Sequence, residues 1–422
     1  MPHILLPAQK NLETWCVVAC DQFTQDMHYW QNVNHITNGH PSTLNLILPE
    51  ILLAHKSASE IQSRSSTIQQ AMRRYLADDV FDAERRCFVY VERKTAYGRM
   101  RRGLVAAVDL EGYEWKPFSK SLIRATEATI ESRIPARKQI RQGAALETPH
   151  VMLLANDQDD IFIGGTERLA KKTPPVYSGD LMMGSGSISG WAIEDEADLD
   201  KVCRSLAVLK GRCFDEEGSC FLFAVGDGNH SLATAKAVWE EEKLKACPNE
   251  NLRFALVEIV NIFDQGLTFE PIHRVLSGCT VGDLISFLCE HLCCDALPCL
   301  SAKELALKVK GSSSDVGIAW LEGSDQHFAL LEVDTTELVV SRLQPLLDEF
   351  DRQHGCTIDF VHGSEEALKL ARAQGSCALL LPPVNKNTFF DTIAHSGPLP
   401  RKSFSMGEAS EKRFYLECRK LL

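Results

Sequence analysis

The sequence predicts an α+β protein with two domains. Its 422 residues exceed what one compact core usually holds. The balance of 45% hydrophobic and 24% charged residues is that of a soluble globular protein. Strand-like runs and hairpins are mixed with helical segments and follow no regular βα repeat, which favours an α+β architecture over a parallel α/β one.

The first predicted domain covers residues 1–275. The apolar run WCVVAC, at residues 15–20, is typical of a buried strand and is closed by Asp21. Pro41-Ser42-Thr43 marks a turn. Residues 57–77 contain no Gly or Pro and have apolar residues three and four apart, which predicts a helix. Further strands are predicted at residues 87–93, 103–110, 150–155, 220–225 and 254–262.

The second predicted domain covers residues 276–422, with a boundary expected between 275 and 300. Its segment VGDLISFLCEHLCC has helical apolar spacing. A hairpin is predicted at residues 316–321 and 327–333, with Gly-Ser-Asp in its turn. A helix at 338–353, a strand at 358–361, a helix at 365–373 and a strand at 377–381 follow. A basic turn lies near residues 400–407.

Charge and cysteine content limit the function classes. Lys+Arg 45 against Asp+Glu 57 gives a net charge of −12, which argues against nucleic-acid and membrane-surface partners. The start lacks a signal-peptide pattern, and no apolar run reaches the roughly 20 residues of a membrane span. The fifteen cysteines follow no disulfide framework. The dense patch from Cys289 to Cys294 lacks the second ligand pair of a metal site, which favours free thiols. We therefore expect a cytoplasmic protein.

The most informative segment is FLFAVGDGNHSLATAKAVWEEEK, at residues 221–243. It combines an apolar strand, a glycine-rich turn and a strong helix former. Such a turn offers free backbone N–H groups and the positive end of a helix dipole, which suit a phosphate or carboxylate. Gly226 and Gly228 permit positive φ and close ligand approach. The alternative is a tight turn in which Ser231 or Asn229 caps the helix.

A second segment, at residues 123–150, is rich in cations within an acidic protein. It contains Arg124, Arg133, Arg137, Lys138 and Arg141. Guanidinium groups suit bidentate phosphate binding, and Glu127 among them would stay ionised. Pro135 argues against one continuous helix here. The alternative is a solvated basic surface paired with Glu131 and Glu147.

Two shorter segments carry polar chemistry: FEPIHR at residues 269–274, and a basic, hydroxyl-rich turn at residues 398–407. Taken alone, each favours a structural role. The sequence lacks the GxxxxGK[ST], GxGxxG, HExxH and GxSxG patterns, so the common ATPase, dinucleotide, zinc-protease and serine-hydrolase interpretations have no support.

Five motifs in order resemble the bacterial and archaeal family called domain of unknown function 1015. They are VACDQFT, TEATIESRIPAR, GDGNHSLATAK, FEPIHR and PRKSFSMGEASEKR, and the resemblance runs from about Trp15 to Arg419. Many members carry a loop of Asp-Gly-His-His-Arg, which here reads Asp-Gly-Asn-His-Ser at residues 227–231. That loop is similar to the phosphate-binding turn of the ParB/sulfiredoxin-like fold, which includes kinases of free serine. The serine at 231 in place of arginine leaves room for altered or lost activity.

The resemblance implies a ParB/sulfiredoxin-like nucleotide-binding core with an additional C-terminal α+β domain. We expect a nucleotide-dependent phosphotransferase using ATP or ADP and Mg²⁺, in its narrowest form a kinase of a free amino acid such as serine. The alternatives are a nucleotide-binding or anion-binding protein without turnover and a phosphoesterase-like hydrolase. The predicted catalytic residues are Asp227, His230 and Glu127, of which Asp227 and Glu127 are also predicted metal ligands. Phosphate or nucleotide binding is predicted for Gly226, Gly228, Asn229, Ser231, Arg124, Arg133, Arg137 and Lys402, and substrate binding for Asp21, His273 and Arg274.

Overall fold

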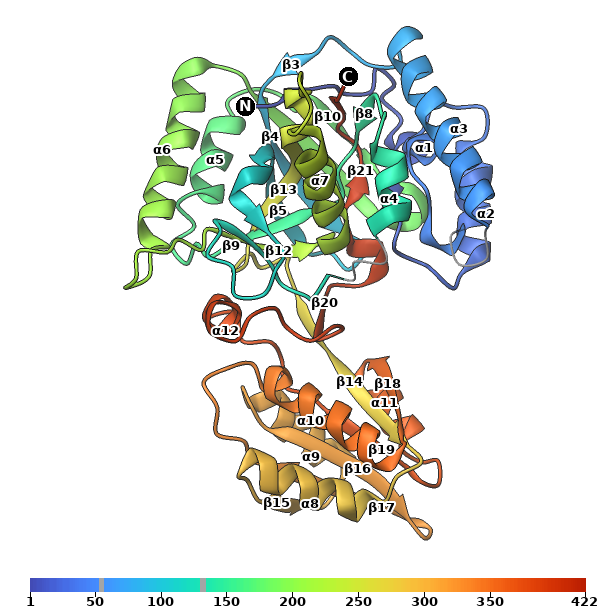
Figure 1. Ribbon diagram of the computed structural model, residues 1–422, viewed down its shortest axis with the longest axis vertical. Helices are drawn as coiled ribbons and strands as arrows, with labels where there is room; N and C mark the ends of the chain where they lie inside the picture. Colours follow the sequence, from blue (N-terminus) through green and yellow to red (C-terminus); the bar gives the residue numbers. More distant parts are fainter. Residues whose placement is uncertain (53–56, 130–133) are drawn as a thin grey trace. The chain divides into compact units, whose positions relative to one another are not determined.

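The computed structural model describes residues 1–52, 57–129 and 134–422, and the chain folds into two compact units (Figure 1). Unit 1 contains Met1–Leu267 and Glu408–Leu422, and unit 2 contains Thr268–Gly407. The chain thus leaves unit 1 once and returns to it at its end. The final segment, Glu408–Leu422, which was predicted to belong to the C-terminal domain, packs within unit 1.

Unit 1 is built on a mixed sheet with the strand order β10-β11-β4-β5-β13-β9-β12-β7-β6. Pairing is antiparallel from β10 to β13, while β13 and β9, β12 and β7, and β6 and β7 pair in parallel. The sheet thus combines antiparallel hairpins with parallel pairs, and it does not follow a regular βα repeat, as the sequence predicts. The strands are β4 (Phe88–Thr95), β5 (Met100–Asp109), β6 (Tyr113–Glu114), β7 (Ile123–Ala125), β9 (Met152–Ala155), β10 (Tyr177–Asp180), β11 (Gly186–Ile193), β12 (Phe223–Asp227) and β13 (Phe254–Asn261).

Three short strand pairs join the two ends of the chain to unit 1. They pair β1 (His3–Ile4) with β3 (Arg85–Arg86), β2 (Val17–Val18) with β21 (Phe414–Tyr415), and β22 (Arg419–Lys420) with β8 (Leu146–Glu147). The amide of Leu5 donates to the carbonyl of Cys418 at 2.8 Å, and the indole of Trp15 donates to the carbonyl of Leu416 at 2.9 Å. Both termini therefore lie at the same end of unit 1 (Figure 1).

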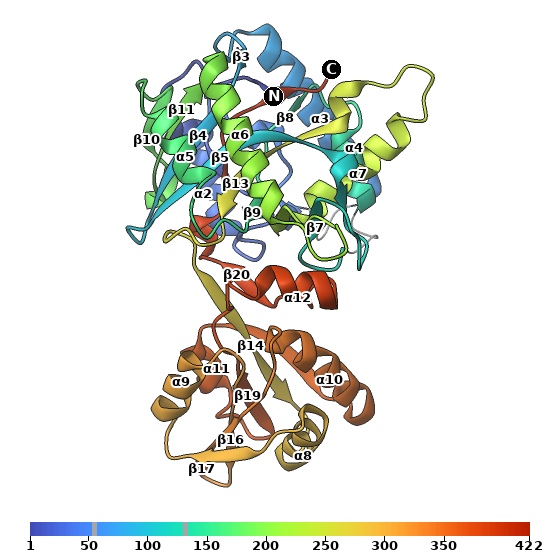
Figure 2. The ribbon, with the colours of Figure 1, turned by 90° about the vertical axis from the view of Figure 1, so that its left-hand side faces the viewer.

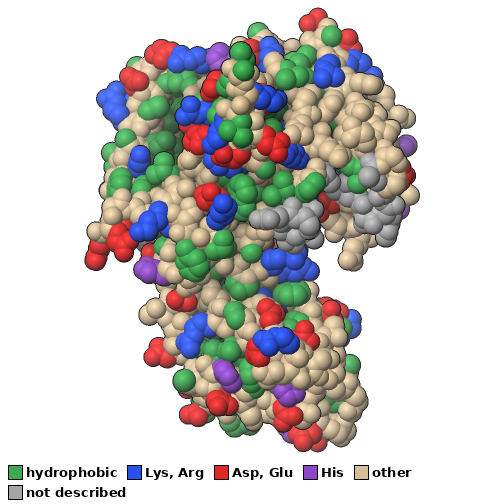
Figure 3. All heavy atoms as spheres, viewed as in Figure 1, with side chains coloured by type: hydrophobic (Ala, Val, Ile, Leu, Met, Phe, Trp, Pro, Cys, Tyr) green, Lys and Arg blue, Asp and Glu red, His purple; other side chains and the backbone are tan. Residues whose placement is uncertain are grey.

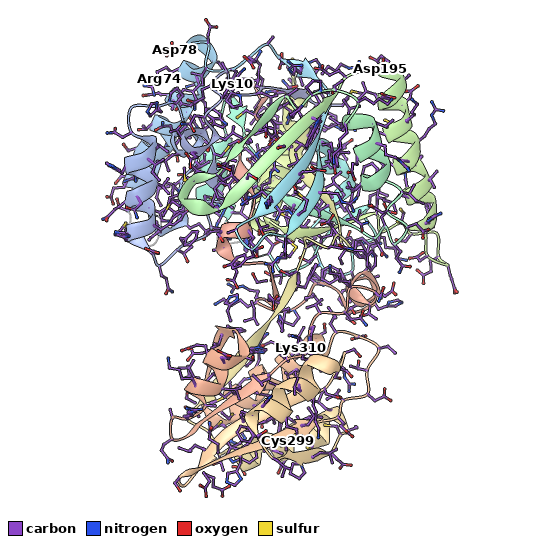
Figure 4. All side chains as sticks on the ribbon, turned by 180° about the vertical axis from the view of Figure 1, so that it is seen from behind. Lys10, Arg74, Asp78, Asp195, Cys299 and Lys310 are labelled. Carbon is purple, nitrogen blue, oxygen red and sulfur yellow. The ribbon has the colours of Figure 1, made fainter. Side chains whose placement is uncertain are left out.

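Two helices of unit 1, at residues 57–77 and after the glycine turn, are predicted by the sequence. They are α1 (Leu12–Trp15), α2 (Met27–Thr37), α3 (Ala58–Ala77), α4 (Ile134–Arg141), α5 (Ile163–Ala170), α6 (Glu196–Arg212) and α7 (Asn229–Glu242). The predicted helix at 57–77 is confirmed as α3, whose start is fixed by a capping box between Ser57 and Glu60. Its end is closed by the amide of Asp78, which donates to the carbonyl of Arg74 at 2.9 Å (Figure 4). Helices α5 and α6 pack together on one side of the sheet, and α4 packs beside α7 (Figure 2).

One expectation for unit 1 needs correction. Trp15 belongs to the short helix α1, capped by Asn11, so only Val17–Val18 of the predicted strand at 15–20 pairs with another strand. Pro135, which argued against one continuous helix through residues 123–150, lies in the first turn of α4. A proline in the first helical turn removes no internal hydrogen bond, so the helix accommodates it.

Unit 2 contains a sheet with the order β15-β17-β16-β19-β14-β18, and β20 pairs with the start of β14. The predicted hairpin is confirmed as β16 and β17, with Gly323 and Ser324 in its turn. The strands are β14 (Phe269–Ser277), β15 (Ala296–Cys299), β16 (Val316–Glu322), β17 (Asp325–Leu331), β18 (Thr357–His362), β19 (Ser376–Leu380) and β20 (Phe404–Met406). The helices are α8 (Val281–Leu292), α9 (Ala302–Gly311), α10 (Val339–His354), α11 (Ser364–Leu370) and α12 (Phe389–Ser396).

All fifteen cysteines are free thiols. In the part of the chain that the structure describes, no helix combines the length and apolar character needed to cross a bilayer.

Candidate functional site

The strand, turn and helix predicted at residues 221–243 are present as β12, Gly228 and α7. Gly228 has φ +81°, a left-handed conformation that disfavours residues with a Cβ. A Cβ there would stand 3.0 Å from Val151 Cγ2 and 3.1 Å from Val151 Cα. Gly226 lies where the pairing of β12 with β9 shifts register. The turn is therefore pressed against the segment that precedes β9.

The side chain of Asn229 joins this turn to the end of β7. Its Oδ1 accepts from the amide of Thr126 at 3.2 Å, and its Nδ2 donates to Thr126 Oγ1 at 3.2 Å. Thr126 Oγ1 in turn donates to the carbonyl of Val225 at 2.5 Å. These hydrogen bonds satisfy the side-chain amide of Asn229 from within the protein. Because Thr126 is held in this way, the next residue, Glu127, follows directly after the contact with the turn.

Asp227 ends β12 and faces a lysine from the C-terminal segment. Its Oδ1 accepts from the amide of Gly228 at 2.9 Å, and its Oδ2 lies 3.5 Å from Lys412 Nζ. The exposed fractions of the two side chains are 13% and 11%. Within the described residues, Asp227 Oδ2 is buried and has no hydrogen-bond partner. Lys412 is not among the predicted residues, although it belongs to the same run, PRKSFSMGEASEKR, as the predicted Lys402.

Asp21 follows β2 and lies within electrostatic reach of His150 and Lys412. Its Oδ1 accepts from Gln22 Nε2 at 3.0 Å. Burial acts to raise the pKa of Asp21, but the electrostatic interaction with His150, the Gln22 hydrogen bond and the charge of Lys412 outweigh it and leave the pKa below its usual value. Asp21 is therefore a carboxylate at neutral pH, close to the group formed by Asp227 and Lys412.

A chain of hydrogen bonds runs from α7 to the segment around β2. Ser231 Oγ lies 3.1 Å from His150 Nε2, and His150 Nδ1 lies 2.7 Å from the hydroxyl of Tyr415. That hydroxyl also accepts from the amide of Cys20 at 3.3 Å. His150 and Tyr415 are both buried. Ser231 is among the predicted residues, whereas His150 and Tyr415 are not, because they meet Ser231 only once the chain is folded.

A cavity of about 170 Å³ in unit 1 is lined by the side chains of Cys20, His150, Ser231 and Tyr415. Helix α7 forms one wall, α4 and α3 contribute to others, and residues 46–48 complete the apolar lining. Arg137 and Glu50, which form an ion pair, also line it. The cavity thus joins an apolar space to a small set of polar groups, as ligand sites in proteins commonly do.

The predicted cations of the 123–150 segment do not all lie at the turn. Arg124 donates to the carbonyl of Ser121 at 3.0 Å and to Ser219 Oγ at 2.8 Å, and it stacks on Phe221, so it lies toward the start of β12. Arg137 lies at the cavity with Glu50. Arg133 lies outside the described residues. His230 is the second residue of α7, directly before Ser231.

Three other predicted residues belong to unit 2. His273 is buried in β14, and its Nδ1 accepts from the amide of Leu381 at 3.1 Å. Arg274 is fully buried and donates to Gln344 Oε1 at 2.7 Å and to the carbonyl of Lys402 at 3.1 Å. Arg274 and Lys402 both lie over the ring of Phe360. All these contacts are internal to unit 2.

The outer surface around α7 carries charges of both signs. Figure 3 shows acidic and basic side chains interspersed over this face. At the end of α7, Lys243 pairs with Glu240 at 2.7 Å. Among the described residues, no three His, Cys, Asp or Glu side chains are grouped closely enough to hold a metal ion by themselves.

Comparisons with known proteins give the following. No curated protein matches the chain. A free serine kinase in complex with AMP has a TM-score of 0.39 and 10% identity, covering 75% of this chain and 92% of that one. A conserved hypothetical protein from Pyrococcus furiosus has a TM-score of 0.35 and 11% identity, covering 74% and 90%. SbnI with C-terminal truncation, from Staphylococcus aureus, has a TM-score of 0.35 and 9% identity, covering 72% and 82%.

A family model matches residues 3–350, most of the chain, and the chain therefore belongs to the family described as protein of unknown function DUF1015.

Proposed function

We propose that this protein binds a nucleotide at the start of α7 and transfers its terminal phosphate to a small acceptor. The observation that carries the proposal is the position of Lys412, whose ammonium lies 3.5 Å from Asp227 at the point where β12 passes into α7. A lysine, two carboxylates and the N-terminus of a helix at one place are the kind of groups that phosphoryl transfer uses for positioning and charge stabilisation.

The phosphate would bind between the first turn of α7 and Lys412. The N-terminus of a helix carries partial positive charge and N–H groups that point outward. Within the described residues, the N-cap Gly228 supplies no side-chain hydrogen bond to these groups. The tight approach of Gly228 to Val151 holds the turn in place, so the groups are preorganised.

The carboxylates would act on the acceptor and on a divalent cation. Asp21, with its lowered pKa, is ionised at neutral pH and would accept a hydrogen bond that orients an acceptor hydroxyl. Asp227 Oδ2, buried and without a hydrogen-bond partner in the described structure, is an oxygen ligand of the type that Mg²⁺ prefers. Together with Glu127, it would hold Mg²⁺ alongside phosphate oxygens and water, and the ion would neutralise charge on the phosphate. Mg²⁺ commonly uses only one or two carboxylates, so a group of three is not required.

The proposed core fold, phosphate donor and acceptor rest on the family resemblance. We place a ParB/sulfiredoxin-like nucleotide-binding core in unit 1, with ATP or ADP as donor and a free amino acid such as serine as the first acceptor to try. The free thiols suit a reducing compartment, for which we propose the cytoplasm. A net charge of −12 and the mixed charges over α7 favour a small-molecule substrate over nucleic acid.

One observation favours binding without turnover as the second candidate. Arg137 is paired with Glu50, and Arg124 is held by Ser121 and Ser219. Neutralisation of the charge on the phosphate would therefore depend mainly on Lys412. Phosphoryl transfer usually needs more neutralisation than one lysine gives. Bound Mg²⁺ would supply it in the kinase, and a protein that only senses a nucleotide would not need it.

The test is thermal stabilisation of the protein by ATP, ADP, AMP and pyrophosphate, each with and without Mg²⁺. A ligand present at about 100 times its Kd stabilises the folded state by about 2.7 kcal/mol. Lys412→Met should weaken binding by about 1.5–3 kcal/mol, as expected for a lost charge-assisted contact. Lys420→Met, which removes a half-exposed lysine paired with Glu84 in the same C-terminal segment, is the matched control.

Turnover then separates the two candidates. Formation of ADP or AMP that depends on added serine would support the kinase, and Asp227→Asn and Asp21→Asn should abolish it without loss of the fold. Nucleotide binding without product from any acceptor would support the binding protein. Absence of stabilisation by all four ligands would refute both.

A further inference from the structure

Ser231 and His150 are arranged as a nucleophile and its base. Ser231 Oγ lies 3.1 Å from His150 Nε2, within the distance over which a histidine removes the proton of a serine hydroxyl. His150 is 7% exposed, so its ring is held by the surrounding protein rather than by solvent. The GxSxG pattern is absent from the sequence, and the pair is visible only in the folded chain.

The hydrogen bonds of Tyr415 orient His150. The hydroxyl of Tyr415 accepts from the amide of Cys20 at 3.3 Å and lies 2.7 Å from His150 Nδ1. In the tautomer that carries its proton on Nδ1, His150 donates from Nδ1–H to this hydroxyl. Nε2 is then the unprotonated nitrogen and faces Ser231, which is the tautomer that a general base requires.

The surroundings stabilise the charges that such a reaction creates. When His150 takes a proton, the carboxylate of Asp21 lies within electrostatic reach of the resulting imidazolium. Ser231 is in the first turn of α7, where the helix dipole favours negative charge on an oxygen. An oxyanion formed on a carbonyl attached to Ser231 would lie near this positive end.

The cavity beside Ser231 defines the group that the site accepts. Its volume is about 170 Å³, and its apolar lining includes Leu46, Leu48, Met72, Ile140, Leu146 and Leu256. An apolar cavity of about 150 Å³ holds a benzene molecule. The space therefore fits an acyl group of benzoyl size or a short alkanoyl chain, with its carbonyl at the polar end formed by Ser231 and His150.

We propose that Ser231 and His150 hydrolyse esters of small apolar acids, with the acyl group bound in this cavity. Ser231 Oγ bonds to the carbonyl carbon while its proton passes to His150 Nε2. The carbon–oxygen bond to the leaving alcohol then breaks, and the alcohol takes the proton from His150. Water, deprotonated by His150, attacks the acyl-serine, the carboxylic acid leaves, and Ser231 Oγ recovers its proton. The balance is one ester and one water giving one acid and one alcohol.

This activity needs neither nucleotide nor metal, so its test is independent of the phosphotransferase proposal. The probes are p-nitrophenyl acetate and p-nitrophenyl benzoate, with release of p-nitrophenol followed by absorbance and the acylated residue identified by peptide mass mapping. The wild-type protein should form an adduct on Ser231. Ser231→Ala should lose adduct and release, and His150→Gln should slow acylation by about 100-fold or more.

Two further variants keep the result interpretable. Ser231→Cys retains a nucleophile at the same position and should still be acylated there. Ser205→Ala is the matched control, since it removes a hydroxyl that donates to the carbonyl of Val202 at 2.8 Å within α6 of the same unit. The proposal is overturned if no adduct forms on Ser231, if the adduct maps to the neighbouring thiol of Cys20, or if Ser231→Ala releases p-nitrophenol as fast as the wild type.

Discussion

Asn229 and Thr126 join two motifs that lie 103 residues apart in the sequence. The amide side chain of Asn229 both accepts from and donates to Thr126, at 3.2 Å in each case. This pairing fixes the start of α7 against the end of β7. It also explains why an asparagine predicted to bind phosphate is turned toward the protein.

Asn229→Ala should therefore destabilise unit 1. The variant leaves the buried amide of Thr126 without its partner, which costs about 1–3 kcal/mol. Urea unfolding followed by circular dichroism measures the loss. Asn32→Ala, on the exposed face of α2, is the control and should leave the midpoint nearly unchanged. An unchanged midpoint for Asn229→Ala together with weakened ATP binding would instead make Asn229 a ligand contact.

Gly228→Ala should also destabilise the fold, for reasons of backbone conformation. Its φ of +81° costs an alanine about 1–2 kcal/mol, and the added Cβ would press on Val151 at 3.0 Å. Gly211→Ala is the opposite case, because Gly211 lies within α6 with open space around it. That variant should raise stability by up to about 1 kcal/mol. Equal effects of the two substitutions on the urea midpoint would contradict the structural role of Gly228.

Local patterns were enough to predict many elements. The capping residues and apolar spacing of α3, and the glycine turn between β16 and β17, act over a few neighbouring residues. The strand, turn and helix around Gly228 are local in the same sense. Such features can be derived from sequence because their determinants lie within the segment itself.

The candidate site was less predictable because it depends on distant parts of the chain. Lys412 and Tyr415 reach it through the pairing of β21 with β2, and no local pattern specifies that pairing. His150 acquires its role only between Ser231 and Tyr415. Arg124 and Arg137 are close in the sequence, but different partners engage them in different places.

Arg413 should be among the residues most important for the stability of unit 1. It is 1% exposed and pairs with Glu258 and with Glu417, the latter at 2.6 Å. Arg413→Met would leave the buried carboxylate of Glu417 without this cation and that of Glu258 with Arg101 at 3.7 Å, which costs about 3–5 kcal/mol.

The comparison variant is Arg85→Met, which breaks an ion pair with Glu194 at the surface. Exposed pairs contribute about 1 kcal/mol or less, so the urea midpoint should barely move. If Arg413→Met were no more harmful than Arg85→Met, the C-terminal segment would not be anchored by this buried group.

His273 should make unit 2 less stable in acid. Burial, and next the charges of Arg274 and His362, lower the pKa of His273 to about 4. In the unfolded chain the pKa returns to about 6.5, so the unfolded state binds the proton more tightly. The stability is complete above about pH 6.5 and falls as the pH drops toward 4, by up to about 3 kcal/mol.

His273→Gln removes this titration but retains an acceptor for the amide of Leu381. The variant will be less stable than the wild type near neutral pH because its packing changes, and the difference should shrink between about pH 7.5 and pH 5. The measurement is the urea midpoint of both proteins across that range, followed by the fluorescence of Trp320 in unit 2. A constant difference would show that protonation of His273 does not oppose folding, and other groups would then account for any acid sensitivity.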